Sequence, residues 1–169
     1  MQRGAPASHQ TFFHGDWNLR RDDILYLMPP LPAIHGVVET ILYTDDLERA
    51  TAFYRDVLGL SEMKGDGHRF QAMDSGANRV LLLFKRGGTL MPQPVPTGGV
   101  IPPHDGHGPL HVAFAIGAAD YDAWCGRLVG ANVAIEGETR WERGGRSLYF
   151  RDPDNHLVEL ATPGIWPNY

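Results

Sequence analysis

The chain has 169 residues, of which 43% are hydrophobic and 21% are charged, a composition typical of a folded domain with its own core. Its formal net charge of −5, without a lysine and arginine cluster, argues against binding to nucleic acid. The single cysteine, Cys125, excludes an internal disulfide, and no apolar run approaches membrane-spanning length. We therefore expect a cytoplasmic protein with neither a nucleic-acid nor a membrane partner.

Residues 1–33 form an N-terminal arm without sustained hydrophobic periodicity. The arm carries more aromatic side chains than a disordered tail usually does: Phe12, Phe13, Trp17 and Tyr26. A short helix over 18–27 would be stopped by the prolines that follow it. The arm is either a loosely ordered appendage or a segment that contacts another subunit.

Residues 34–86 follow the order of a βαβββ module. Val37–Tyr43 alternates as a strand does, and residues 45–58 follow a helical period. Asp45, with Glu48 three residues later, is the expected N-cap, and Gly59 is the expected stop. Three short strand-like runs complete the module, at 60–64, 68–72 and 79–85.

The same order returns after residues 87–108, a segment rich in proline and glycine that we expect to be a linker without a strand ladder. The second module, 109–163, starts with a strand at His111–Ile116 and a helix at Ala119–Val129. Further strand-like runs follow at 132–135, 139–143 and in the hairpin 147–160, before a tail at 164–169.

The two modules are an internal repeat. A shift of 72 residues places Glu39 on His111, and a shift of 71 places Gly59 on Gly130. Each unit is too small to cover its own sheet. The predicted fold is therefore α+β, with two βαβββ modules forming a curved mixed sheet around a shared cleft.

The hairpin 147–160 carries a carboxylate, that of Glu159, at a position that strand alternation predicts. Asp152-Pro153-Asp154-Asn155 has the composition of a tight turn between two alternating strands. On the return strand Glu159 shares its face with the apolar Leu157 and Ala161. A charge on such a face needs a partner, and a metal ion is one candidate.

Three stretches, ETILYTDDLERATAFYRDVLGL, GPLHVAFAI and SLYFRDPDNHLVEL, resemble the vicinal oxygen chelate superfamily. This family includes glyoxalase I, extradiol dioxygenases, and the fosfomycin and bleomycin resistance proteins. The resemblance covers residues 34–163. It implies a divalent metal in the cleft, with open positions for two neighbouring oxygens of a small-molecule substrate, and a homodimer.

Carried over residue by residue, the resemblance implies that Glu39, His111 and Glu159 are the metal ligands. Strand parity agrees, and the small Ala113 and Ala115 leave room beside His111. One imidazole with two carboxylates suits Fe, Mn, Ni or Zn. Glu159 is also a candidate catalytic residue.

Two departures from the family pattern matter. Glu39 stands where the family usually has histidine, and the run 79–85 offers only leucines where glyoxalase I would place a fourth ligand. Three ligands fit dioxygenases or resistance-type transferases better than glyoxalase I. Alternatively, the two glutamates pair with arginines such as Arg146 or Arg151, which would leave a metal-free protein of the bleomycin-sequestering kind.

The remaining candidates surround the cleft. His104 and His107, in IPPHDGHGP, are expected near its mouth, where either is a proton shuttle, a fourth ligand or a solvated loop residue. Side chains that would contact substrate, unless they are core residues, are Tyr43, Trp141, Arg146 and Tyr149. The sequence thus predicts a metal-dependent enzyme of the dioxygenase or lyase/isomerase type, with a metal-free small-molecule binding protein as the alternative.

Overall fold

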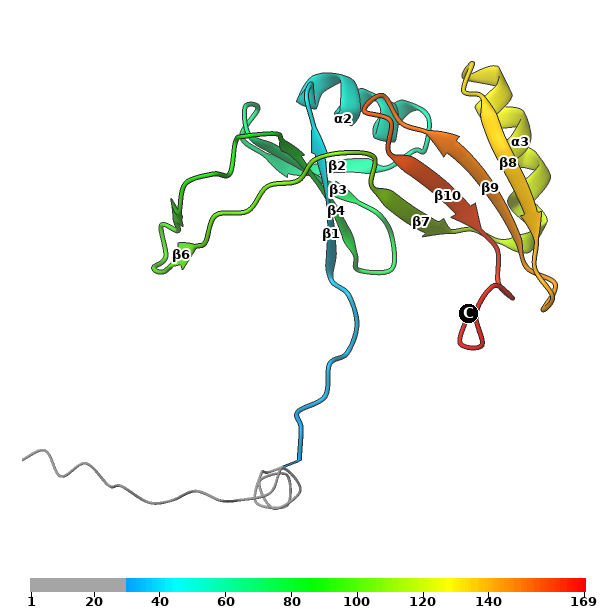
Figure 1. The fold of residues 1–169 in the computed structure, drawn as a ribbon, viewed down its shortest axis with the longest axis horizontal. Helices are drawn as coiled ribbons and strands as arrows, with labels where there is room; N and C mark the ends of the chain where they lie inside the picture. The colour runs from blue at the N-terminus through cyan, green and yellow to red at the C-terminus, as the bar shows by residue number, and fades with distance from the viewer. Residues whose placement is uncertain (1–29) are drawn as a thin grey trace, which may run out of the picture. The chain divides into compact units, whose positions relative to one another are not determined.

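The computed structural model describes residues 30–169, within which Gly36–Tyr169 forms one compact unit (Figure 1). The helix expected at 18–27, and the packing expected of most of the arm, lie outside the described residues. The first module contains β1 (Glu39–Thr44), α2 (Leu47–Asp56), β2 (Ser61–Gly65), β3 (Phe70–Asp74) and β4 (Val80–Lys85). The second contains β7 (His111–Ala115), a 3-10 turn (Ala118–Asp120), α3 (Tyr121–Gly130), β8 (Ile135–Arg140), β9 (Arg146–Arg151) and β10 (Leu157–Ala161).

Each module folds into a four-stranded mixed sheet, in the orders β1-β4-β3-β2 and β7-β10-β9-β8. The first and last strands of each module are parallel, and the other pairs are antiparallel. Ile41 pairs with Leu82 in the first sheet, just as Ala113 pairs with Glu159 in the second. The α+β fold of two βαβββ modules is therefore confirmed, and Leu82 occupies the position that corresponds to Glu159.

Helix α2 begins one residue later than expected. Its N-cap is Asp46, whose side chain accepts the Arg49 backbone N–H at 3.0 Å, so the prediction of Asp45 was wrong. Asp45 has other partners: its backbone N–H donates to Asp154 at 2.8 Å and its carboxylate lies 2.7 Å from Arg86. The predicted stop is confirmed, since Gly59 takes φ +73° just after the helix.

Two other expectations need correction. The segment 87–108 does contain a short ladder, in which β5 (Gln93–Pro94) pairs with β6 (Val100–Ile101). The intervening Gly98 and Gly99, at φ +110° and +87°, allow the chain to reverse there. The runs expected at 132–135 and 139–143 are instead one strand, β8, because an irregularity in its pairing with β9 between Ile135 and Gly137 accommodates the break in alternation.

Helix α2 packs against strands of both modules, so the two share one core. Phe53 lies 6.4 Å from Phe150 of β9, and Tyr54 lies 6.4 Å from Phe114 of β7, measured between ring centroids. Arg127 of α3 donates to the backbone carbonyls at the end of α2, at 2.5 and 2.8 Å, which satisfies acceptors that a helix C-terminus leaves free. Among the helices of residues 30–169, none combines the length and apolar character needed to cross a membrane.

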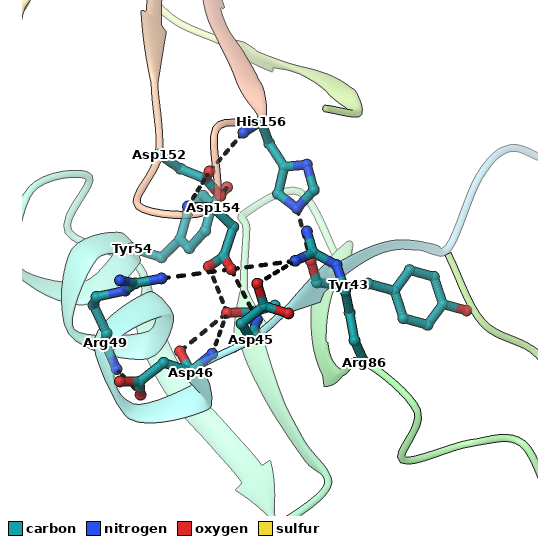
Figure 2. Close-up of polar contacts among 10 residues, drawn as sticks. Tyr43, Asp45, Asp46, Arg49, Tyr54, Arg86, Asp152, Asp154 and His156 are labelled. Atoms are coloured by element: carbon teal, nitrogen blue, oxygen red, sulfur yellow. Dashed lines mark hydrogen bonds and ion pairs between the residues drawn. The ribbon is translucent and has the colours of Figure 1, made fainter. Parts of the chain in front are cut away.

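A polar network also ties the β9–β10 hairpin to the first module (Figure 2). Asp152 accepts the Tyr54 hydroxyl at 2.9 Å, together with the backbone N–H groups of Asp154 and His156. Asp154, whose side chain is fully buried, accepts the Thr44 hydroxyl at 2.5 Å. The turn expected only to reverse the chain therefore also joins the two modules.

Candidate functional site

Glu159 lies in the middle of β10 and is 6% exposed, so its carboxylate is held by protein groups rather than by water. Its Oε1 accepts the Ser147 hydroxyl at 2.5 Å and the Tyr149 hydroxyl at 3.2 Å, both from the neighbouring strand β9. Its Oε2 lies 3.1 Å from Nε2 of His111 on β7. The carboxylate is thus fixed on one oxygen and directed toward an imidazole with the other.

The donors on Oε1 are themselves supported. Trp141 donates through Nε1 to the Ser147 hydroxyl at 2.9 Å, which aligns that hydroxyl with Glu159. Burial raises the pKa of Tyr149, while its hydrogen bond with Ser147 lowers it and the Glu159 charge raises it. The phenol is therefore protonated at neutral pH and can donate to the carboxylate.

Ser147 is a site residue that the sequence analysis missed. It is fully buried and shares a face of β9 with Tyr149, opposite Ala161 and Glu159 of β10. The sequence could have identified Ser147, since the alternation of the predicted hairpin places Ser147 and Glu159 on the same face.

Glu39 lies on the other sheet, near the start of β1. It lines a pocket of about 250 Å³ on the face of the first module that also carries Ile41 and Leu82. The complete lining is Glu39, Ile41, Arg69, Phe70, Leu82, Phe84, Thr89, Met91, Gln93, Ile101, Pro102 and His104. The predicted ligand and the predicted proton shuttle thus line one cavity.

His104 is held in place by two contacts. Its main chain is joined to Thr89, since its N–H donates to the Thr89 carbonyl at 3.1 Å and its own carbonyl accepts the Thr89 hydroxyl. Its Nδ1 lies 2.6 Å from the Tyr43 hydroxyl. Burial, with a smaller contribution from Asp105, raises the pKa of Tyr43, so its phenol is protonated where it meets His104. His107, by contrast, has a side chain that is 80% exposed.

The three predicted metal ligands are therefore divided between the sheets. His111 and Glu159 are in contact, and Glu39 lies on the first module with His104. Among the residues that the structure describes, no group of three or more His, Cys, Asp or Glu side chains is arranged to hold a metal ion. Within one copy of the chain, the structure brings together two of the three.

The arginines have other partners. Arg146 lies on the opposite face of β9 from Glu159, with its guanidinium 3.4 Å from the centroid of the Tyr121 ring, which corrects its expected place among the substrate contacts. The physical reason is strand alternation, which sends Arg146 and Ser147 to opposite faces. Arg151 donates to Glu136 at 3.0 Å. Neither arginine is a partner of Glu159, so the pairing proposed for a metal-free protein is not formed there.

The pair of His111 and Glu159 has the chemistry of a metal site. An imidazole nitrogen and a carboxylate oxygen are common ligands of Mn, Fe, Ni and Zn ions. Hydrogen bonds to the non-ligating oxygen, such as those from Ser147 and Tyr149, are the outer contacts that orient such ligands. These residues fit a divalent ion, which His111 Nε2 and Glu159 Oε2 would hold.

Comparison with known proteins agrees with the fold described above. A sequence model described as the Glyoxalase/Bleomycin resistance protein/Dioxygenase superfamily matches residues 35–160. Among solved structures, lactoylglutathione lyase from Agrobacterium tumefaciens is similar, with a TM-score of 0.71 and 32% sequence identity over 80% of this chain and 99% of that one.

Several curated relatives are metallothiol transferases named FosB, and two of them serve as examples. The protein from Lysinibacillus sphaericus is 29% identical over 131 residues, which cover 76% of this chain and 83% of the relative. The protein from Shouchella clausii is 43% identical over 54 residues, 31% of this chain, and this match spans 37% of that relative's length. The relatives thus include both a lyase and a transferase.

Proposed function

The chain belongs to the Glyoxalase/Bleomycin resistance protein/Dioxygenase superfamily, and we propose that it is a divalent-metal-dependent enzyme that acts on a small molecule by chelating two neighbouring oxygens. The observation that carries this proposal is the contact of 3.1 Å between His111 and a Glu159 carboxylate whose other oxygen is fixed by two hydroxyl donors. The cofactor is one of Mn, Fe, Ni or Zn.

The bound ion would act as a Lewis acid that stabilises negative charge developing on the chelated substrate oxygens. The protein orients the ligand Glu159, leaves space for the substrate and supplies an acid–base group. Ser147 and Tyr149 hold Glu159 in one orientation, and the small Ala113, which pairs with Glu159, leaves space beside the ligands. His104, which lines the pocket with Glu39, is the proposed group that transfers a proton to or from the substrate.

The reaction class follows from this division of roles. The similar proteins are named as a lyase and as transferases. In both classes of reaction a charged oxygen develops and a proton or leaving group moves, which a Lewis acid and one acid–base residue can support. We propose lyase/isomerase or transferase chemistry, with the cytoplasm as its location.

The proposed active form is a homodimer in which each site combines residues of two copies. Glu39 lines the cavity on the first module, and His111 and Glu159 lie on the corresponding face of the second. A two-fold arrangement that sets the first module of one copy against the second module of its partner would bring the three ligands together twice. This arrangement would also bring the pocket that His104 lines to the same site.

Metal analysis tests the metal site. The protein is purified without chelators, and bound metal is measured together with Glu159→Gln and with Glu136→Gln, which changes an exposed glutamate that pairs with Arg151. We expect Glu159→Gln to lower metal affinity by at least about tenfold, and Glu136→Gln to leave it unchanged. Equal metal content in all three proteins would contradict the assignment of Glu159 as a metal ligand.

Mixing two inactive variants tests the shared site. Separately purified Glu39→Gln and Glu159→Gln are unfolded together and refolded, so that mixed dimers form. If each site takes Glu39 from one copy and Glu159 from the other, one of the two sites in each mixed dimer regains both glutamates. Statistical pairing then restores about one quarter of the wild-type metal sites. No recovery would show that Glu39 and Glu159 do not meet across subunits.

A further inference from the structure

The two modules repeat in backbone but differ in the face that each turns toward the proposed site. On the second module this face carries Glu159 and His111, which are in contact, together with the small Ala113 and Ala115. On the first module the corresponding positions are apolar or aromatic. Through the matching strand pairs, Leu82 and Phe84 correspond to Glu159 and Ala161, and Ile41 and Tyr43 correspond to Ala113 and Ala115.

Aromatic rings make up much of one wall of the first-module pocket. Phe70 of β3 and Phe84 of β4 stack with their centroids 5.7 Å apart and an interplanar angle of 28°. The His104 ring meets Phe84 edge to face, at 4.9 Å and 86°. Such ring faces and edges bind another planar group in the same stacked or edge-on geometries.

The segment 87–108 also contributes to the pocket lining. Met91, Ile101 and Pro102 from this segment line the pocket, as do Thr89 and His104, whose main chains are hydrogen-bonded to each other. The cavity of about 250 Å³ has room for one substituted ring, since an apolar cavity of roughly 150 Å³ holds a benzene molecule.

Two of the lining side chains carry a formal charge, Arg69 and Glu39. The Arg69 guanidinium already contacts Asp66 at 3.4 Å and Gln93 at 2.7 Å, and it lies 5.5 Å from the centroid of the Phe70 ring. Glu39 is one of the proposed metal ligands. Most of the other lining residues are apolar, and they therefore offer a substrate mainly apolar contact.

We infer that this pocket binds an aromatic ring or a comparable planar, apolar group of the substrate. The inference rests on the proposed function and deepens it, because it names the substrate class: a molecule that joins a pair of neighbouring oxygens to an apolar body about one ring in size. The oxygens face the ligands of the second module, and the ring lies between Phe84 and the segment 87–108 of the first. A small, wholly polar substrate would leave this surface exposed to water.

Two chelators with the same pair of oxygens test the inference. Acetohydroxamate and benzohydroxamate differ in carrying a methyl or a phenyl group, and their affinities for the Mn²⁺-loaded protein are measured by calorimetry. We expect benzohydroxamate to bind at least about tenfold more tightly, because its ring is removed from water in the pocket. Equal affinities would overturn this inference and leave the proposed function standing. Binding of neither chelator would overturn both.

Variants of residues that line the pocket test whether the preference for benzohydroxamate arises there. Met91 is 77% exposed and Ile101 is 48% exposed, so Met91→Glu and Ile101→Glu add a charge at the pocket wall without unfolding a core. Each is expected to reduce the preference for benzohydroxamate to about twofold or less, since a buried ring beside a carboxylate loses its advantage. Met63→Glu, at a methionine of β2 that is 57% exposed, is the matched control and should keep the preference. Retention of the preference in both pocket variants would overturn the assignment.

Discussion

The imidazole of His156 donates through Nε2 to the backbone carbonyl of Tyr43 at 2.8 Å, which joins the closing hairpin of the second module to strand β1 of the first. The tautomer follows from the other nitrogen. Nδ1 lies 2.9 Å from the backbone N–H of Leu110, a group that can only donate, so Nδ1 accepts and the proton is on Nε2. His156 is 1% exposed and neutral in this arrangement.

We predict that His156→Ala destabilises the protein by about 2–4 kcal/mol, because it leaves the Leu110 N–H and the Tyr43 carbonyl without their partner and opens a cavity. Urea unfolding at pH 7 measures the loss. His107→Ala, which truncates a side chain that is 80% exposed, should change stability by less than about 0.5 kcal/mol. Similar values for the two variants would contradict a joining role for His156.

Ser147→Ala should weaken metal binding while the ligands stay in place. It removes the hydroxyl that fixes Oε1 of Glu159 and leaves Trp141 without its acceptor. Loss of such an outer contact typically costs about 10–100-fold in metal affinity. Competition with a fluorescent chelator gives the affinity, and Ser61→Ala, at an exposed residue of β2, is the control. An unchanged affinity for Ser147→Ala would mean that the hydroxyl does not position the ligand.

Metal removal should lower the melting temperature of the wild-type protein more than that of Glu159→Gln. A ligand present at 100 times its dissociation constant stabilises the folded state by about 2.7 kcal/mol, and a chelator removes that contribution. Scanning calorimetry with and without EDTA is expected to show a shift for the wild-type protein and for Glu136→Gln. Glu159→Gln should show a smaller shift, because its metal affinity is lower, and an equal shift for all three would place the metal elsewhere.

Asp66 makes stability depend on pH in the acid range. Burial acts to raise its pKa, but hydrogen bonds from the backbone N–H groups of Arg69, Phe70 and His68 and from the Arg69 side chain lower it to about 2. Because the folded-state pKa lies below the ordinary value of 3.8, the carboxylate stabilises the fold above that pH, and the contribution is lost as the pH falls toward about 2. Asp66→Asn keeps a side-chain acceptor but removes the charge. Its stability deficit at pH 7, from urea unfolding, should therefore shrink toward zero at pH 2, and a deficit of constant size would contradict this account.

Gly106 permits the close approach of its loop to Tyr43. A Cβ at this position would lie 2.4 Å from the Tyr43 ring. Gly106→Ala should therefore destabilise the protein by about 1–3 kcal/mol and move the ring that contacts His104. A Cβ added at Gly126 of α3 would meet only open space, so Gly126→Ala should instead stabilise the protein by about 0.5–1 kcal/mol. Thermal unfolding compares the two, and a shift in the same direction for both would contradict the prediction.

Much of this protein follows from local patterns in its sequence. The alternation of β1, β7 and β10 identifies the faces that carry Glu39, His111 and Glu159, and the repeat of strand and helix signals predicts two matching modules. These features are local because side-chain direction in a strand repeats every two residues, whatever lies beyond it. The same rule identifies Ser147 as a neighbour of Glu159 and directs Arg146 to the other face.

Tertiary structure alone decides which of these faces meet. Glu39 and Glu159 occupy equivalent modules, yet in one copy of the chain they line different sheets, because α2 and the network around Asp152 and His156 join the modules on their helix-covered side. A long-range contact is also involved at the start of α2, where Asp46 rather than Asp45 is the N-cap. The backbone N–H of Asp45 binds Asp154, a residue far along the chain. The sequence determined the chemistry of each face, and long-range packing determined the partners of that face, because partner choice depends on contacts between residues distant in the chain.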